Sequence, residues 1–137
     1  MLTDGRGVPL ALTVAGANRN DFKLLRATLD ALVVRRPRPT RERPQGLCLA
    51  KGSDCAEVYA LLRARRFTPH VRARGEEVTA KRTRGHRARR WVVERTHSWT
   101  NRCRALLVRW DKHEANYLAS LHFACAYTAF RAARLLG

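Results

Sequence analysis

The stretch "LCLAKGSDCAEVYALLRARRFTPHVRA", residues 47–73, changes twice from one local pattern to another. Residues 47–50 form a short apolar run, which predicts a strand. Residues 53–67 repeat their apolar side chains at helical spacing, which predicts a helix. Residues 68–73 predict an edge strand, because Pro69 cannot donate a hydrogen bond to a neighbour. A strand, a helix and a second strand in this order predict an α/β unit with a partly parallel sheet.

The residues before this unit predict a hairpin, a helix and a loop. Residues 1–14 contain the turn signal Asp4-Gly5, followed by an apolar strand. Residues 22–34 place large apolar side chains at helical spacing. The prolines and charges of residues 35–46 exclude regular structure there and keep the segment in solvent.

The residues after the unit predict a polar, mobile segment over residues 74–89 and two helices, one over 89–110 and one over 113–135. Short polar side chains that can cap helices precede the two earlier helices. They are Asn20 or Asp21 for the first of these helices, and Ser53 or Asp54 for the second.

The composition says more about the kind of molecule that the chain binds than about its fold. With 137 residues and 45% hydrophobic side chains, the chain is long enough for one domain with a core. Its formal net charge of +17 predicts attraction to polyanions, above all nucleic acid; a solvated basic surface is the alternative. No segment predicts a signal peptide or a membrane span, so we expect a soluble intracellular protein. The cysteines lack metal-binding spacing and are expected to be buried, reduced thiols, namely Cys48, Cys55, Cys103 and Cys125.

A helix over residues 89–110 would have a buried stripe and a polar strip on opposite sides. The expected stripe consists of Val92, Trp99, Cys103, Leu106 and Trp110. Glu94 falls opposite it, in a sector shared with Arg87, Arg90, His97, Ser98 and Asn101. Glu94 is then either a surface carboxylate paired with Arg90, or a metal ligand flanked by arginines that hold phosphates.

Other candidate residues also allow two interpretations. His97 lies on the same face as Glu94. It could form a hydrogen bond or contact a phosphate, or it could have no such role. Trp91 could stack on bases, whereas Trp99 and Trp110 are expected in the core. The segment 35–44 could touch DNA phosphates or serve as a solvated connector.

Three stretches of the sequence resemble the DDE-type transposases of bacterial insertion sequences. They are "LTDGRGVPLALTVAGANRNDFKLLRATLDAL" (2–32), "LCLAKGSDCAEVYALLRARRFTPHVRARGEE" (47–77) and "RRWVVERTHSWTNRCRALLVRWDKHEANYLASLHFACAYTAFR" (89–131). The resemblance implies a ribonuclease-H-like fold, a mixed sheet flanked by helices. Residues 1–137 would be the C-terminal part of that catalytic domain, without its first strand. A product without that central strand is expected to be less stable unless another chain supplies it.

In this family an Asp, a second Asp and a Glu hold two Mg²⁺ ions that promote attack on a DNA phosphodiester. The resemblance matches Glu94 to the catalytic, metal-binding glutamate and Arg90 to an upstream arginine, while Arg87 stands where a tyrosine is usual. It implies a set of DNA contacts consisting of Arg87, Arg90, Arg95, His97, Asn101 and Arg102.

The sequence departs from the family at the other two ligands. Ala50 stands where the second aspartate is expected, and an alanine methyl cannot bind Mg²⁺. Asp54 matches a helix start, as Asp21 does, and Asp4 matches the hairpin turn. The first aspartate would lie upstream of residue 1. Only Glu94 is then expected to survive of the three.

The sequence is compatible with three functions. The first is a truncated, catalytically inactive transposase that acts on insertion-sequence ends in the bacterial cytoplasm, at the nucleoid. The second is a non-catalytic DNA-binding module or repressor of full-length transposase. The third is a chain with no function. The expected partners are DNA, full-length transposase or a separate N-terminal reading frame, with no membrane.

Overall fold

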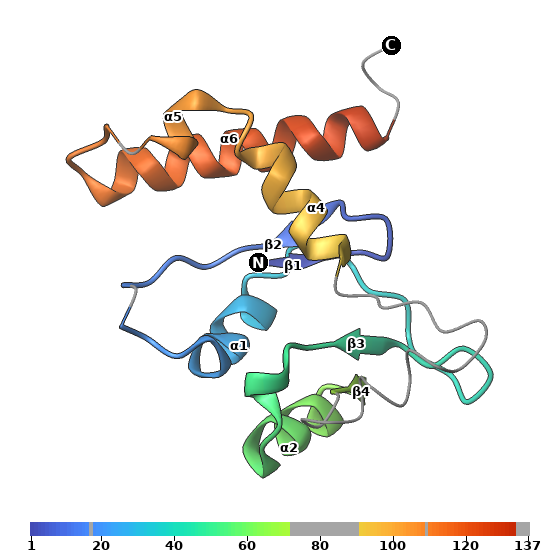
Figure 1. Ribbon diagram of the computed structural model, residues 1–137. Coiled ribbons are helices and arrows are strands. Elements are labelled where there is room, and N and C mark those ends of the chain that lie inside the picture. The colour runs from blue at the N-terminus through green and yellow to red at the C-terminus, as the bar shows by residue number, and fades with distance from the viewer. Residues whose placement is uncertain (17, 72–90, 109, 134–137) are drawn as a thin grey trace, which may run out of the picture.

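The computed structural model describes residues 1–16, 18–71, 91–108 and 110–133. Short strands and helices are interspersed over residues 1–71, and helices follow over residues 91–133 (Figure 1). The elements are β1 (Leu2–Thr3), β2 (Pro9–Ala11), α1 (Asp21–Asp30), β3 (Gly46–Cys48), the 3₁₀ turn η1 (Lys51–Ser53), α2 (Ala56–Ala64), β4 (Thr68–His70), α4 (Trp91–Thr100), α5 (Arg104–Leu107) and α6 (Glu114–Ala132). The predicted segment 74–89 lies outside the described residues.

The predicted hairpin is present. Strands β1 and β2 pair in antiparallel fashion. The carboxylate of Asp4 accepts hydrogen bonds from the backbone N–H groups of Arg6 and Val8, both at 2.8 Å. The backbone N–H of Asp4 also donates to the Val8 carbonyl at 3.0 Å. Asp4 is therefore used as the turn residue that the sequence indicated.

The predicted α/β unit is also present. Strands β3 and β4 pair in parallel, with Gly46 opposite Thr68 and Cys48 opposite His70. Helix α2 connects them and packs against β4. Within the described residues the strands make two separate two-stranded sheets, not one continuous mixed sheet.

The capping predicted for α2 is wrong. The chain first tightens into η1, where the Ser53 N–H donates to the Ala50 carbonyl at 2.9 Å, so α2 begins later than expected. Its N-cap residue is Cys55, with no side-chain capping bond. The Asp54 carboxylate instead accepts a hydrogen bond from the Tyr59 hydroxyl at 3.0 Å. Asn20 is the N-cap residue of α1, also without a side-chain bond.

One core cluster joins α1, β3 and α2. Its buried members are Leu25, Leu29, Leu47, Val58 and Leu62. Leu2 of β1 packs against this cluster, so the hairpin and the α/β unit share apolar contacts although their sheets are separate. Burial of such side chains stabilises the fold by roughly 1.5–3 kcal/mol each.

The single long helix predicted over residues 89–110 is wrong. Helix α4 ends at Thr100, and the separate short helix α5 follows after Cys103, whose backbone is extended. The break has a local cause: the Thr100 hydroxyl donates to the His97 carbonyl at 2.9 Å, and threonine and asparagine are weak helix formers. It also has a tertiary cause, because the turn lets α5 pack on α6 and bury Leu106.

The predicted buried stripe is only partly present: Leu106 is buried and Val92 and Trp99 are half-buried, but Cys103 and Trp110 are not buried. Trp110 is 76% exposed and Cys103 is also exposed, because the helix does not continue to place them against a neighbour. The buried residues of α4 are Thr96 and Thr100. Two threonines are thus the closest-packed side chains of the helix.

The last helix lies where it was predicted, but the first is shorter than predicted. Helix α1 ends at Asp30, and Val33 beyond it is 90% exposed. Figure 1 shows α6 across the top of the molecule, α4 running from it to the hairpin, and the α/β unit below. None of the described helices is both long enough and apolar enough to span a bilayer. All four cysteines are free thiols, but Cys48 and Cys103 are exposed, contrary to the expected burial.

Candidate functional site around Glu94

Helix α4 has one side that is fixed against the hairpin. Thr96 is fully buried there, and its hydroxyl donates to the Gly7 carbonyl at 2.7 Å while lying 3.1 Å from the Val92 carbonyl. Gly7 has φ +86°, and a Cβ on it would lie 3.0 Å from the Thr96 hydroxyl oxygen. Only glycine fits this position without strain, because the turn needs positive φ and the helix approaches closely.

Arg95 belongs to the same side of α4. Its guanidinium lies 4.5 Å from the ring centre of Trp91 and 4.8 Å from that of Trp99. It also donates a hydrogen bond to the Arg6 carbonyl in the hairpin turn. Such stacking and hydrogen bonding hold a guanidinium in place, so Arg95 fastens α4 to the hairpin.

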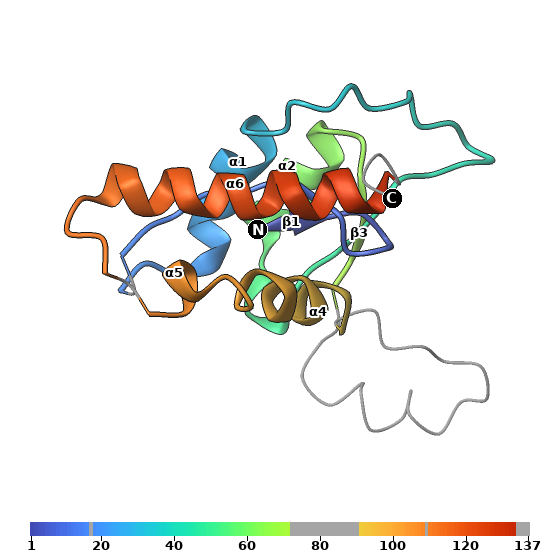
Figure 2. The same ribbon diagram turned by 90° about the horizontal axis from the view of Figure 1, so that it is seen from above.

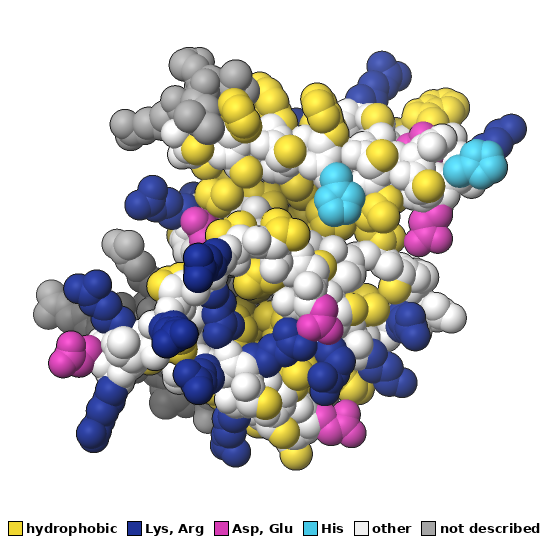
Figure 3. Space-filling model, turned by 180° about the vertical axis from the view of Figure 1, so that it is seen from behind, with side chains coloured by type: hydrophobic (Ala, Val, Ile, Leu, Met, Phe, Trp, Pro, Cys, Tyr) yellow, Lys and Arg dark blue, Asp and Glu magenta, His cyan; other side chains and the backbone are white. Residues whose placement is uncertain are grey.

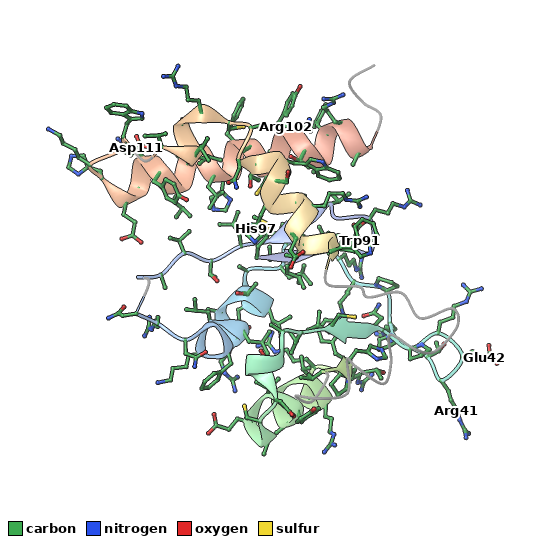
Figure 4. All side chains as sticks on the ribbon, viewed as in Figure 1. Arg41, Glu42, Trp91, His97, Arg102 and Asp111 are labelled. Carbon is green, nitrogen blue, oxygen red and sulfur yellow. The ribbon has the colours of Figure 1, made fainter. Side chains whose placement is uncertain are left out.

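The opposite side of α4 carries Glu94 and is open. A depression of about 500 Å³ is lined by Glu94, His97, Ser98, Asn101, Arg102 and Leu107. Helical spacing predicted that Glu94, His97, Ser98 and Asn101 share one sector, and the structure brings these four together. The turn after α4 adds Arg102 to the lining, and α5 adds Leu107. Figure 4 shows His97 on α4 and Arg102 beyond the C-terminal end of that helix.

Two predicted members of the site, Arg87 and Arg90, lie outside the described residues. The predicted pairing of Glu94 with Arg90 lies outside them too. Of the predicted DNA contacts, His97, Asn101 and Arg102 line the depression, whereas Arg95 points to the hairpin.

His97 also lines a second, narrower cavity of about 140 Å³ between α4, the hairpin and α6. The pKa of His97 is lowered from its ordinary value of 6.5, first by partial burial and then by the positive charge of the chain's amino terminus. A lowered pKa keeps the imidazole neutral near pH 7. His97 therefore offers a hydrogen-bonding ring to the depression rather than a positive charge.

Among the described residues, the oxygen ligands needed for a magnesium site do not gather around Glu94. Ala50 follows β3 and has no ligating atom. The carboxylate of Asp54 accepts from Tyr59, that of Asp4 accepts from two backbone N–H groups of its own turn, and Asp21 begins α1. The described residues contain no cluster of three or more His, Cys, Asp or Glu that could hold a metal. One carboxylate, Glu94, does not fit the several hard oxygen ligands that Mg²⁺ prefers in a two-metal site.

The tryptophans and the Pro/Arg loop are placed only in part as expected. Trp91 is 48% exposed at the start of α4, and the expected burial of Trp110 is wrong. The loop is tied at one end by Arg36, whose guanidinium lies 3.9 Å from the centre of the Phe67 ring and donates to the Arg65 carbonyl at 2.7 Å. The loop then extends away from α4, and Arg41 and Glu42 mark its far part in Figure 4.

The contact between α4 and the hairpin was not predicted from the sequence. Neither Thr96 nor Gly7 lies in a sequence motif that indicates this contact. The one available signal was the small residue Gly7 beside the turn signal Asp4-Gly5, and a glycine there is also expected for the turn alone.

Comparison with known proteins identifies the family. Residues 1–129 match the family model described as "Transposase DDE domain". The chain is 32% identical, over 98% of its length, to a Burkholderia cepacia protein named "Putative transposase for insertion sequence element IS402". It spans 63% of the length of that relative. No solved structure matches the chain. This chain belongs to the DDE-domain transposase family, whose members act on DNA and generally use a divalent metal.

Proposed function

We propose that this chain is a DNA-binding member of the transposase family that does not cleave DNA by itself. The observation that carries the proposal is Ala50, which stands where the family's second metal-binding aspartate is expected. Glu94 is the family's glutamate, in a depression that lacks a second carboxylate among its lining residues. A two-metal mechanism needs several oxygen ligands, which this set does not supply.

The DNA contacts in this proposal are the polar and cationic groups around Glu94. His97, Asn101 and Arg102 line the depression, and Arg87 and Arg90 precede α4 in the sequence. The net charge of +17 supplies the long-range attraction to phosphates. In place of the DNA contact first expected of it, Arg95 holds α4 in position through the hairpin. The protein would act in the bacterial cytoplasm, at the nucleoid.

The proposed fold is the ribonuclease-H-like sheet of the family with one strand position open between β1 and β3. Two separate two-stranded sheets that share a core through Leu2 are what such a sheet would leave without its central strand. Sequence that corresponds to the rest of the longer relative, in full-length transposase or a separate reading frame, would supply that strand. Residues 1–137 are, in this proposal, the C-terminal part of the catalytic domain.

The cleavage test uses DNA that carries insertion-sequence ends, with Mg²⁺. We expect no nicking by the chain, and no change in this result for Glu94→Ala. Magnesium-dependent nicking that disappears in Glu94→Ala would refute the proposal, because it would require a complete metal site around Glu94.

The binding test separates a DNA-binding protein from a chain with no function. We expect affinity for DNA that falls steeply with salt and does not respond to a chelator, because phosphate contacts release counterions and need no metal. The alternative of a repressor of full-length transposase makes the same prediction and adds inhibition of the intact enzyme. A chain that fails to bind DNA at low salt would contradict both.

A further inference from the structure

Helix α6 presents an exposed aromatic stripe on its outer side. Phe123 is 76% exposed, Tyr127 49% and Phe130 50%, and their spacing of four and three residues places them on one face. The buried residues of the helix, Ala124 and Cys125, lie on the other side, toward α4 and the hairpin. In Figure 2 the outer side of α6 is uncovered along the described helix, and Figure 3 shows hydrophobic side chains gathered over this part of the molecule.

The charge pattern sets this face apart from the rest of the chain. The chain has 28 Lys and Arg among 137 residues, yet none lies between Glu114 and Phe130. A face without cations is a poor surface for DNA phosphates. Two strongly basic copies can approach through such a face with less repulsion than through a face that carries cations.

The stripe is complementary to itself when two copies of the helix run in opposite directions. A two-fold axis at the level of Ala124 and Cys125 places Phe123 opposite Ala126 of the second copy. The same axis places Phe130 opposite Ala119 of the second copy. Ala119 and Ala126 are exposed on the same face as the aromatic rings. Each large side chain thus meets a small one, as close packing between helices requires.

We propose that the outer face of α6 is the interface with a second copy of this chain, packed as an antiparallel helix pair. Aromatic side chains of this size bury roughly 150–250 Å² each when fully covered. With their observed exposure and the neighbouring alanines, the face would bury on the order of 500 Å² per copy, or about 1,000 Å² in total. That area reaches the lower bound for a specific interface and fits a weak, reversible dimer.

The test is the oligomeric state of the 137-residue chain, measured by light scattering and sedimentation over a concentration series, free of nucleic acid. We expect a mass that rises toward twice 15.6 kDa. Phe123→Glu should return the mass to that of one chain, because it places a carboxylate at the centre of the interface. Val33→Glu is the matched control: Val33 is 90% exposed beyond α1, and this change should leave the dimer intact.

A pair of substitutions tests the register itself. Ala126→Phe would set phenylalanine against phenylalanine and should weaken the dimer about tenfold or more. Adding Phe123→Ala to that variant restores a large side chain opposite a small one and should recover most of the affinity. Circular dichroism of every variant checks that the chain stays folded, as expected for changes at exposed positions.

Three results would overturn the proposal. The first is the mass of a single chain at every concentration, which would leave the face to a different partner. The second is a dimer that survives Phe123→Glu. The third is a double variant that associates no better than Ala126→Phe alone.

Discussion

The two sides of α4 differ in how they are held. On one side, Thr96 is fully buried and bonded to the hairpin, and Arg95 lies against two tryptophan rings. On the other side, Glu94, His97 and neighbouring polar residues surround an open depression. The closely packed side fixes the position of the helix, whereas the polar groups of the open side line the depression.

On this one helix, one side is held by packing against the hairpin, and the other side is the one proposed to contact DNA. Substitutions on the hairpin side should lower the free energy of unfolding. Substitutions on the open side should change the affinity for DNA and leave folding nearly unchanged.

The largest effect is expected for Gly7→Ala. The alanine would have to adopt the positive φ of Gly7, and its methyl group would lie 3.0 Å from the Thr96 hydroxyl oxygen. The variant should therefore lose roughly 3 kcal/mol of stability. Urea unfolding measures this loss. Gly5→Ala in the same turn is the control: nothing lies within 4 Å of the added Cβ, and the change should stay within about 0.5 kcal/mol. Equal losses in the two variants would mean that the turn, not the approach of α4, determines the cost.

Thr96→Val should have the next largest effect. The substitution keeps the shape but leaves the buried Gly7 carbonyl without its donor, which costs about 1–3 kcal/mol. Thr128→Val is the matched control, because among the described residues the Thr128 hydroxyl bonds to the Ala124 carbonyl of its own helix, at 2.9 Å, and to no other element. If Thr128→Val proved as costly as Thr96→Val in thermal or urea unfolding, the bond to the hairpin would have no special weight.

On the open side, Arg102→Gln should weaken DNA binding and lower the salt dependence by about one phosphate contact. Glu94→Gln should leave the affinity for DNA unchanged or raise it, because it removes a negative charge from the side of α4 that is proposed to contact DNA. Both variants should unfold within about 0.5 kcal/mol of the unmodified chain. Fluorescence anisotropy at several salt concentrations measures the affinities. A marked loss of affinity in Glu94→Gln would instead indicate a direct role for the carboxylate in holding DNA.

The smallest expected effect is a pH dependence from His97. Its pKa is lower in the folded chain than the ordinary 6.5, so the unfolded chain binds the proton more readily. The free energy of unfolding should therefore fall as the pH drops below about 6.5, and this slope should be weaker in His97→Gln. Urea unfolding at a series of pH values checks the difference. An identical slope in both proteins would assign the effect to other groups.

Much of the local structure was predictable because it depends on neighbouring residues. The turn at Asp4-Gly5 and the strand–helix–strand order of residues 47–70 follow from short patterns, and both are present. The sector around Glu94 was predictable for the same reason, since residues three and four apart on a helix share a face. That this sector binds DNA stays a prediction.

The errors arose where distant contacts override local preference. Residues 89–110 have an apolar spacing that suits one helix, but the break at Cys103 lets α5 pack on α6 and leaves Trp110 exposed. The prediction that Ser53 or Asp54 caps α2 was wrong because η1 precedes the helix and moves its start to a later residue. Neither event is visible in the spacing of one segment.

The sequence by itself determined the family and the basic character of the chain, because residue identity alone decides the formal charge and carries the match to the family model. Only the tertiary structure decided which side of α4 is buried. Thr96 and Arg95 face the hairpin because Gly7, far away in the sequence, leaves room for the helix to approach. That placement depends on long-range packing, which periodicity along one helix does not encode.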